Sequence, residues 1–217
     1  MNIRWLGRVK YEEALALQNE LVAEKADGPE FVDQLLLLEH ESVFTIGRTR
    51  DQSSLRDPAL LSAPCVVTNR GGQATWHGPG QLVGYPILDL RRRAADLHRY
   101  LRDLEDVVIA ICARVGVATQ RKEDLTGVWV GDRKIASIGV GVRRWITMHG
   151  FALNVCGPLE GFDHIIPCGI SGVKMTSLER EGGVGVTVEK VAQIAADVFP
   201  AMFDGVASVQ RSVRAGE

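Results

Sequence analysis

The stretch from Gly127 to Val155 constrains the fold most, because its pattern predicts three consecutive antiparallel strands. Gly127–Val130 and Arg133–Val142 are separated by Gly131-Asp132, a Gly-X pair suited to a type II′ hairpin turn. A third strand, Trp145–Val155, follows at once. A β-meander in the middle of the chain requires an antiparallel or mixed sheet whose apolar faces other elements must cover.

Helices are predicted on both sides of this meander. Apolar residues recur at three- and four-residue steps over residues 97–115, with Asp96 as N-cap and Gly116 after the last turn. Similar patterns predict helices over residues 11–26 and 188–203, and short apolar runs predict strands at 34–38, 43–46, 65–68 and 82–88. The sequence therefore predicts an α+β fold with a mixed sheet and flanking helices. No repeat or linker divides residues 1–217, so we expect a single domain.

Composition excludes several classes of protein. The chain has 217 residues, enough for one domain with a sizeable core, and its net charge of −2 offers no basic field for nucleic acid. No apolar run has the length of a membrane-spanning helix, and the first residues lack the apolar core of a signal peptide. The four cysteines and five histidines show no metal-ligand spacing. We therefore expect a reduced, cytoplasmic protein with neither a metal nor another cofactor.

Cys168 stands out among the cysteines because it lies between Pro167 and Gly169 and outside any periodic apolar pattern. Proline ends regular pairing and glycine permits unusual backbone shapes, so this thiol is predicted on a tight loop that a substrate can reach. Cys112 falls in the apolar stripe of a predicted helix, and Cys65 adjoins two valines. Both of these are predicted to be plain core residues.

Lys134 is the second candidate for chemistry. In a strand over 133–142, the period of two places it on the same face as Ala136, Ile138 and Val140. An ammonium at the end of such an apolar row would favour the reactive thiolate of a nearby cysteine. The alternative is a hairpin-end lysine in solvent, and sequence alone does not show that Lys134 meets Cys168.

A glycine-rich segment, Arg70–Gln81, lacks both a helix-opening GxGxxG and the Gly-Lys-Ser/Thr end of a P-loop. Its glycines still allow close approach of backbone to a ligand, although a tight loop without ligand remains the alternative. In His149–Asn154, the histidine is more often structural than catalytic, Gly150 marks close backbone approach, and Asn154 is suited to ordering a loop.

Four segments together resemble one family, the octanoyltransferases of lipoate biosynthesis. They are Arg70–Gln81, Lys134–Gly139, His149–Asn154 and Pro167–Ile170, in the family's order and spacing. The resemblance covers roughly residues 30–180. Trp76 stands where the family often has tyrosine, a replacement of one large aromatic residue by another.

The resemblance implies a fold shared with the catalytic modules of biotin and lipoate protein ligases. It also implies that Cys168 carries the acyl group and that Lys134 lowers the pKa of that thiol. Substrate contacts would come from three segments, with supporting roles for His149, Asn154 and Gly169. The implied contact residues are Arg70, Gly71, Gly72, Gln73, Ala74, Thr75, Trp76, His77, Ser137, Ile138, Gly139, Gly150, Phe151 and Ala152.

The implied donor is octanoyl-acyl carrier protein. The implied acceptors are the lipoyl domains of 2-oxoacid dehydrogenase E2 subunits and the H protein of glycine cleavage. We expect a monomer that binds neither nucleic acid nor membrane. Arginines at 91–93, 99, 102 and 143–144 would either form a docking patch for acidic partners or be scattered and solvated.

Three other interpretations stay open at this point. An ATP-dependent lipoate or biotin ligase would need no cysteine, and an amidotransferase would move octanoyl between two lipoyl domains. A non-catalytic acyl-binding protein would form no covalent intermediate. Cys168 in its Pro-Gly setting favours a transferase over the first of these.

Overall fold

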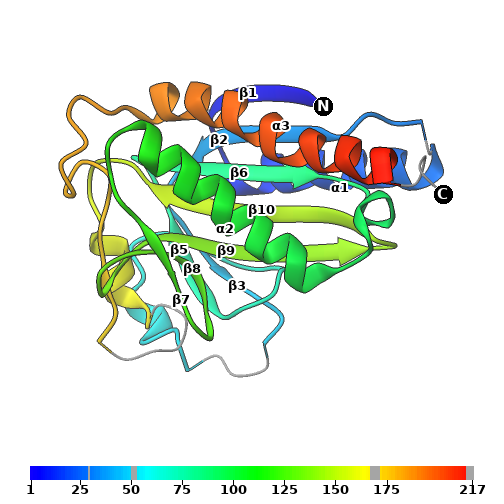
Figure 1. Cartoon of the computed structure of the whole chain (residues 1–217). Coiled ribbons are helices and arrows are strands. Elements are labelled where there is room, and N and C mark those ends of the chain that lie inside the picture. The colour runs from blue at the N-terminus through cyan, green and yellow to red at the C-terminus, as the bar shows by residue number, and fades with distance from the viewer. Residues whose placement is uncertain (29, 50–52, 167–171, 214–217) are drawn as a thin grey trace.

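The computed structural model describes residues 1–28, 30–49, 53–166 and 172–213, with side chains as far as Phe203. A large mixed sheet crosses the molecule (Figure 1). Its strand order is β1 (Asn2–Val9), β2 (Gln34–His40), β6 (Gln81–Ile87), β10 (Ile146–Asn154), β9 (Arg133–Arg143), β8 (Leu125–Val130) and β7 (Gln120–Lys122), and β11 (Lys174–Met175) pairs with β9.

A second sheet of three strands lies beside one end of the first (Figure 1). Its order is β4 (Cys65–Val67), β3 (Val43–Ile46) and β5 (Ala74–His77). Short 3₁₀ turns at Pro58–Leu60, Leu90–Arg93 and Glu160–His164 connect the elements. The small sheet matters for function because it carries the glycine-rich segment.

In the described part of the chain, three helices cover the large sheet: α1 (Tyr11–Asp27), α2 (Leu97–Arg114) and α3 (Val188–Val213). Helices α2 and α3 lie side by side over one face (Figure 1), where Leu35 and Leu37 belong to their core cluster. Leu36 and Leu38 belong to the cluster on the opposite face, together with residues of α1. The run of four leucines is therefore explained by a strand that is buried on both faces.

The predicted class and the predicted meander are confirmed. Strands β8 and β9 meet through a two-residue turn between Val130 and Arg133, and Gly131 has the positive φ, +55°, that a II′ turn needs at its first central position. Strands β9 and β10 then pair in register from Arg143–Ile146 inward. No helix in the described part of the chain has the length and apolar character that crossing a membrane requires.

Strands β1 and β5 and the end of the last helix are among the backbone features that sequence reasoning missed. Strand β1 was missed because it is an edge strand whose side chains are exposed or half-buried, and β5 was missed because it lies in the glycine-rich segment that predicted a loop. The last helix continues to Val213 rather than ending near Phe203. Its Gly205 lowers helix stability by only about 1 kcal/mol, which the rest of the helix can offset.

The two predictions for structural cysteines came out differently. Cys112 lies on the buried face of α2 and is fully buried in the core, as predicted. Cys65 is exposed, so its prediction was wrong. It lies on β4, the edge strand of the small sheet, where the side chains of Cys65 and Val67 alternate outward from that of Val66.

Candidate active site

A cavity of about 490 Å³ opens where β8 and β9 diverge. The two strands pair from Val130–Arg133 to Val128–Ala136, with a bulge on the way. Beyond that point the glycine-rich segment takes the place of β8, since the Gly71 amide donates to the Val140 carbonyl at 2.8 Å. The cavity therefore lies between the large sheet, the small sheet and α2.

Most of the residues that the sequence singled out line this one cavity. They are Lys134, His149, Arg70, Gly71, Gly72, Gln73, Ala74, Thr75, His77, Ser137, Ile138, Gly139, Gly150, Phe151 and Ala152. Trp76 and Asn154 do not line it, and Cys168 and Gly169 lie outside the described residues. Segments far apart in the chain thus converge on the site.

Trp76 points away from the cavity. Strand β5 alternates, so that Thr75 and His77 face the cavity while the indole of Trp76 packs edge-on against Phe162, with ring centroids 5.4 Å apart. The indole also covers Gly161, where any Cβ would lie 2.3 Å from the ring. Trp76 is therefore part of the core of the small sheet and is not one of the residues that could contact a substrate in the cavity.

Lys134 is buried, with only 1% of its surface exposed, which excludes the solvated hairpin-end alternative. Its Nζ donates to the Thr126 carbonyl of β8 at 2.9 Å and lies 5.4 Å from the centre of the Trp129 ring. Carbonyl and aromatic face both stabilise a positive charge. The ammonium is thus held at the point where β8 and β9 begin to separate.

Both flanks of the 167–171 segment are attached to cavity walls. On the near side, the Ile166 amide donates to the Ser54 carbonyl at 2.6 Å, and the Ser54 hydroxyl accepts from the Ala74 amide at 3.0 Å. On the far side, the Thr176 amide donates to the carbonyl of Lys134 itself at 2.9 Å. The chain on either side of Cys168 is therefore tied to the same walls as Lys134 and the glycine-rich segment.

Asn154 strengthens the second attachment. Its amide nitrogen donates to the Thr176 carbonyl, and its amide oxygen accepts from Gln81, each at 2.9 Å. Gln81 in turn bonds His77 at 2.7 Å. This buried chain of hydrogen bonds links β6, β10 and the segment that follows Cys168.

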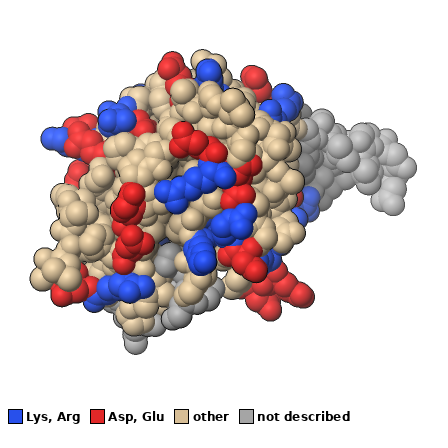
Figure 2. Space-filling view, turned by 90° about the vertical axis from the view of Figure 1, so that its left-hand side faces the viewer, with Lys and Arg blue, Asp and Glu red and all other residues tan. Residues whose placement is uncertain are grey.

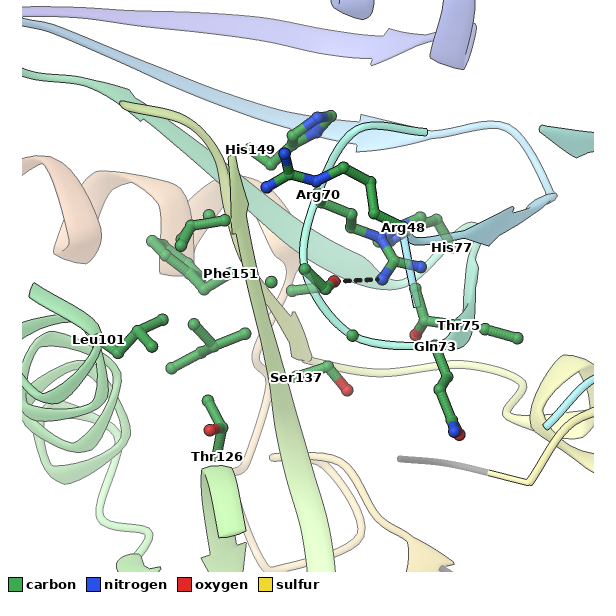
Figure 3. Close-up of a pocket in the computed structure, with 18 of the residues that line it drawn as sticks. Arg48, Arg70, Gln73, Thr75, His77, Leu101, Thr126, Ser137, His149 and Phe151 are labelled. Atoms are coloured by element: carbon green, nitrogen blue, oxygen red, sulfur yellow. Dashed lines mark hydrogen bonds between the residues drawn. The ribbon is translucent and has the colours of Figure 1, made fainter. Parts of the chain in front are cut away.

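Arg70 forms much of the polar end of the cavity (Figure 3). Arg70 is 7% exposed, and its guanidinium bonds the Thr45 carbonyl at 2.7 Å, the Thr45 hydroxyl at 2.8 Å and the Gly71 carbonyl at 2.9 Å. These bonds join β3 to the glycine-rich segment. Arg48 lies beside it and is exposed.

Buried histidines and tyrosines stand behind Arg70, and three of them, Tyr11, His40 and Tyr85, lie in segments without a recognisable motif. His40 bonds the Tyr85 hydroxyl at 2.8 Å. Burial lowers the pKa of His40 to about 4 and that of His77 to about 3, and it raises the pKa of Tyr11 to about 12. The group is therefore uncharged at neutral pH, which suits hydrogen bonding to a neutral amide or carbonyl.

His149 has both a structural bond and a place on the cavity wall. Its φ of +56° is rare for a side-chain-bearing residue, and its Nε2 lies 2.6 Å from the Asn69 side-chain oxygen. Burial, followed by the nearby Arg70 and Arg48, lowers its pKa to about 4. A neutral imidazole is thus held in one orientation at the polar end.

The opposite end of the cavity is apolar. Figure 3 shows Leu101 and Phe151 there, across the cavity from Arg48, Arg70 and His77. Leu97, Leu125 and Ile138 also line the cavity. Their helical spacing predicts that Leu97 and Leu101 pack against the sheet. The same spacing does not predict that they line a cavity.

Three of the arginines considered for docking form ion pairs within the chain. Arg91 bonds Asp89, Arg93 bonds Asp33, and Arg102 bonds Glu105. Figure 2 shows basic and acidic side chains intermixed on the face that it displays. Within the described residues, no group of three histidine, cysteine or acidic side chains is placed to hold a metal ion.

Residues 10–200 match the family described as the lipoyl protein ligase A/B catalytic domain. The chain belongs to this family. It is 54% identical over 197 residues to an octanoyltransferase of Geobacter sulfurreducens (90% of this chain, 82% of the relative), and 50% identical over 204 residues to one of Geobacter metallireducens (94% of each). These relatives confirm the predicted resemblance to octanoyltransferases. They also confirm that this member of the lipoyl ligase family is an acyltransferase.

Solved structures of this fold confirm the predicted architecture. A lipoate-protein ligase A bound with ATP superimposes with a TM-score of 0.75 over 94% of this chain and 86% of that one, at 14% identity. A biotin protein ligase from Aquifex aeolicus in complex with biotin and ATP gives 0.59 over 95% and 72%, also at 14% identity. At such identity the likeness establishes the shared fold alone.

Proposed function

We propose that this member of the lipoyl ligase family moves an octanoyl group from octanoyl-acyl carrier protein, through a thioester on Cys168, to a lysine of a lipoyl domain. One observation carries the proposal: both flanks of the cysteine segment are hydrogen-bonded to the walls of the cavity that holds buried Lys134. The relatives named octanoyltransferase, which are 54% and 50% identical to this chain, support octanoyl as the group that is transferred.

In the first half-reaction, the Cys168 thiolate attacks the carbonyl carbon of the carrier thioester. A new C–S bond forms to the enzyme and the C–S bond to the carrier breaks. The departing carrier thiolate takes a proton from the Lys134 ammonium, which leaves Lys134 neutral. Exchange of one thioester for another is near isoenergetic, so this step needs no ATP.

In the second half-reaction, the acceptor lysine arrives as an ammonium, because the ordinary pKa of a lysine side chain is about 10.4. Neutral Lys134 takes one proton from it, and the free amine attacks the acyl-enzyme carbonyl. A C–N bond forms, the C–S bond breaks, and the second proton leaves to solvent. The thiolate and the ammonium are thereby restored, and the downhill formation of an amide drives the cycle.

The two ends of the cavity fit the two parts of such a substrate. An eight-carbon chain along Leu101, Ile138 and Phe151 would gain about 0.8 kcal/mol per buried methylene. At the polar end, the neutral imidazoles of His77 and His149 suit hydrogen bonds to the amide-rich arm that carries the thioester. Lipoyl domains of 2-oxoacid dehydrogenase E2 subunits and the glycine cleavage H protein are the proposed acceptors, and the cytoplasmic, monomeric state stays a prediction.

The test is intact-mass analysis after mixing the protein with octanoyl-carrier protein, without ATP. We expect an added octanoyl group that disappears in Cys168→Ala and persists in the matched control Cys65→Ala, since Cys65 is exposed but lies on β4. Addition of a lipoyl domain should then discharge the adduct. An adduct that survives Cys168→Ala, or transfer that requires ATP, would refute the proposal in favour of another nucleophile or a ligase.

A further inference from the structure

Glu105 is a fully buried carboxylate on α2, outside the cavity lining. Its Oε2 accepts from Arg102 at 2.8 Å and from Arg121 at 3.0 Å. Its Oε1 accepts from the backbone amide of Gly127 on β8 at 2.9 Å. Burying a carboxylate is costly unless it is paired and hydrogen-bonded, so all of these contacts are needed to hold it.

The Gly127 amide and the Thr126 carbonyl belong to one peptide unit. The Thr126 oxygen accepts the bond from Lys134 Nζ at 2.9 Å. In a planar trans peptide the N–H and the C=O point in opposite directions, so this unit bridges Glu105 on one side and Lys134 on the other. Negative charge on the N–H side polarises the unit and strengthens its carbonyl as an acceptor for an ammonium.

Gly127 makes room for this arrangement. Its φ is +126°, a region that residues with side chains rarely adopt. A Cβ at this position would lie 2.6 Å from Lys134 Cε and 2.9 Å from its Nζ. It would also lie 2.6 Å from the backbone oxygen of Ala136, so glycine is required both for the lysine to reach the Thr126 carbonyl and for the close approach of β8 to β9.

We propose that Glu105 is a positioning residue for Lys134, acting through the Thr126–Gly127 peptide unit. This inference rests on the proposed pairing of Lys134 with Cys168. Glu105 sets where the ammonium stands, and through it the fraction of Cys168 that is thiolate. The same helix carries Leu101 in the acyl end one turn earlier, so α2 fixes both the wall of the cavity and the lysine behind it (Figure 3).

The experiment measures alkylation of Cys168 by iodoacetamide against pH, read on the Cys168 peptide by mass spectrometry. Gly127→Ala and Glu105→Gln are compared with Lys134→Ala and with Asp106→Asn. Asp106 is the matched control, because it neighbours Glu105, is partly exposed and pairs with the same Arg121, whereas the Gly127 amide bonds Glu105.

We expect the pH of half-maximal alkylation to rise in Lys134→Ala, Gly127→Ala and Glu105→Gln, and to stay unchanged in Asp106→Asn. Octanoyl transfer should fall about 100-fold in Gly127→Ala, since displacing a catalytic group by an ångström costs about that much. It should fall about tenfold in Glu105→Gln, which keeps an oxygen for Gly127 but loses the charge. Glutamine keeps the shape of glutamate, which guards against simple unfolding, and thermal melting verifies it.

The outcomes separate the two proposals. If Lys134→Ala leaves the pH profile unchanged, the pairing of Lys134 with Cys168 fails and the inference about Glu105 fails with it. If Lys134→Ala shifts the profile while folded Gly127→Ala and Glu105→Gln do not, the positioning role alone is overturned. A purely structural role for Glu105 would lower the melting temperature without moving the profile.

Discussion

The wall built on the small sheet and the wall built by β8 and β9 each present a buried cation to the same cavity, Arg70 and Lys134. Arg70 bonds the carbonyl and hydroxyl of Thr45 and the carbonyl of Gly71. Lys134 bonds a carbonyl of the neighbouring strand and lies over an indole ring. Neutral groups of the protein therefore contact and stabilise both charges.

The two cations differ in whether they can give up a proton. A guanidinium stays charged at any physiological pH and holds its acceptors through a rigid fork of donors, whereas an ammonium can give up a proton and take it back. Arg70 therefore fits a scaffold that joins β3 to the glycine-rich segment. Lys134, whose own carbonyl anchors the chain after Cys168, fits a proton carrier.

The largest expected effect comes from removing Lys134. In Lys134→Ala we expect the rate of octanoyl transfer to fall about 10²–10⁴-fold, the usual contribution of a proton-transfer group. Lys122→Ala is the matched control, because Lys122 lies 4.8 Å from the same Trp129 ring but is partly exposed and paired with Asp132. Transfer kinetics measure both variants, and equal losses would remove the distinction between the two lysines.

Arg70→Ala should act first on stability. Three buried oxygens lose a charged donor, so we expect the free energy of unfolding to drop by about 3 kcal/mol in a denaturant titration. Arg48→Ala, which removes an exposed arginine from the same cavity wall, should leave it nearly unchanged. If the Arg70→Ala variant were fully stable but unable to bind substrate, Arg70 would be a substrate-binding residue and its assignment to the scaffold would be wrong.

A third test concerns the apolar end. Leu101→Trp should fill that end and exclude the distal methylenes of octanoate. The rate of octanoyl transfer should then fall about fourfold for each methylene excluded. The rate of transfer from a butanoyl carrier protein should stay unchanged, because its shorter chain does not reach that end. Competition between the two acyl carrier proteins measures the ratio, and an unchanged preference would place the acyl chain elsewhere.

A fourth test concerns the pH dependence of stability. Burial lowers the pKa of His40 to about 4, so the folded protein keeps it neutral while the unfolded chain binds a proton below about pH 6.5. Its stabilising contribution is complete above that pH and is lost as the pH falls towards 4. His40→Gln should flatten the stability curve in this window by up to about 1.4 kcal/mol per pH unit. Unfolding titrations between pH 4 and 7 measure this, with the exposed His98→Gln as control.

Local patterns predicted much of the fold. The meander from Gly127 to Val155 and the stripe of α2 are set by hydrophobic period and turn chemistry, which neighbouring residues decide. Strand β5 and the exposure of Cys65 were missed because partners distant in the chain decide them. Trp76 shows the same limit: a motif indicates that a segment lies at a site, while the pleat decides which of its side chains face it.

The candidate site was predictable in its members more than in its geometry. Lys134, Arg70 and the glycines came from motifs, and they do line one cavity. Glu105, Tyr11 and Tyr85 came from the structure alone, because each is embedded in a pattern that packing already explains. Glu105 in particular falls among the apolar positions of α2, and its bonds to Arg102, Arg121 and the Gly127 amide explain a charge there.

Strand β6, which directly follows the glycine-rich segment, is hydrogen-bonded between β2 from the first part of the chain and β10 from the second. The early and late parts of the polypeptide are thus interleaved at the centre of the sheet. On the ribosome, a chain that has emerged only as far as α2 holds the glycine-rich segment but lacks the neighbour that completes the middle of the sheet. Catalytic competence should therefore arrive late in synthesis, after both β10 and the segment with Cys168 have left the exit tunnel.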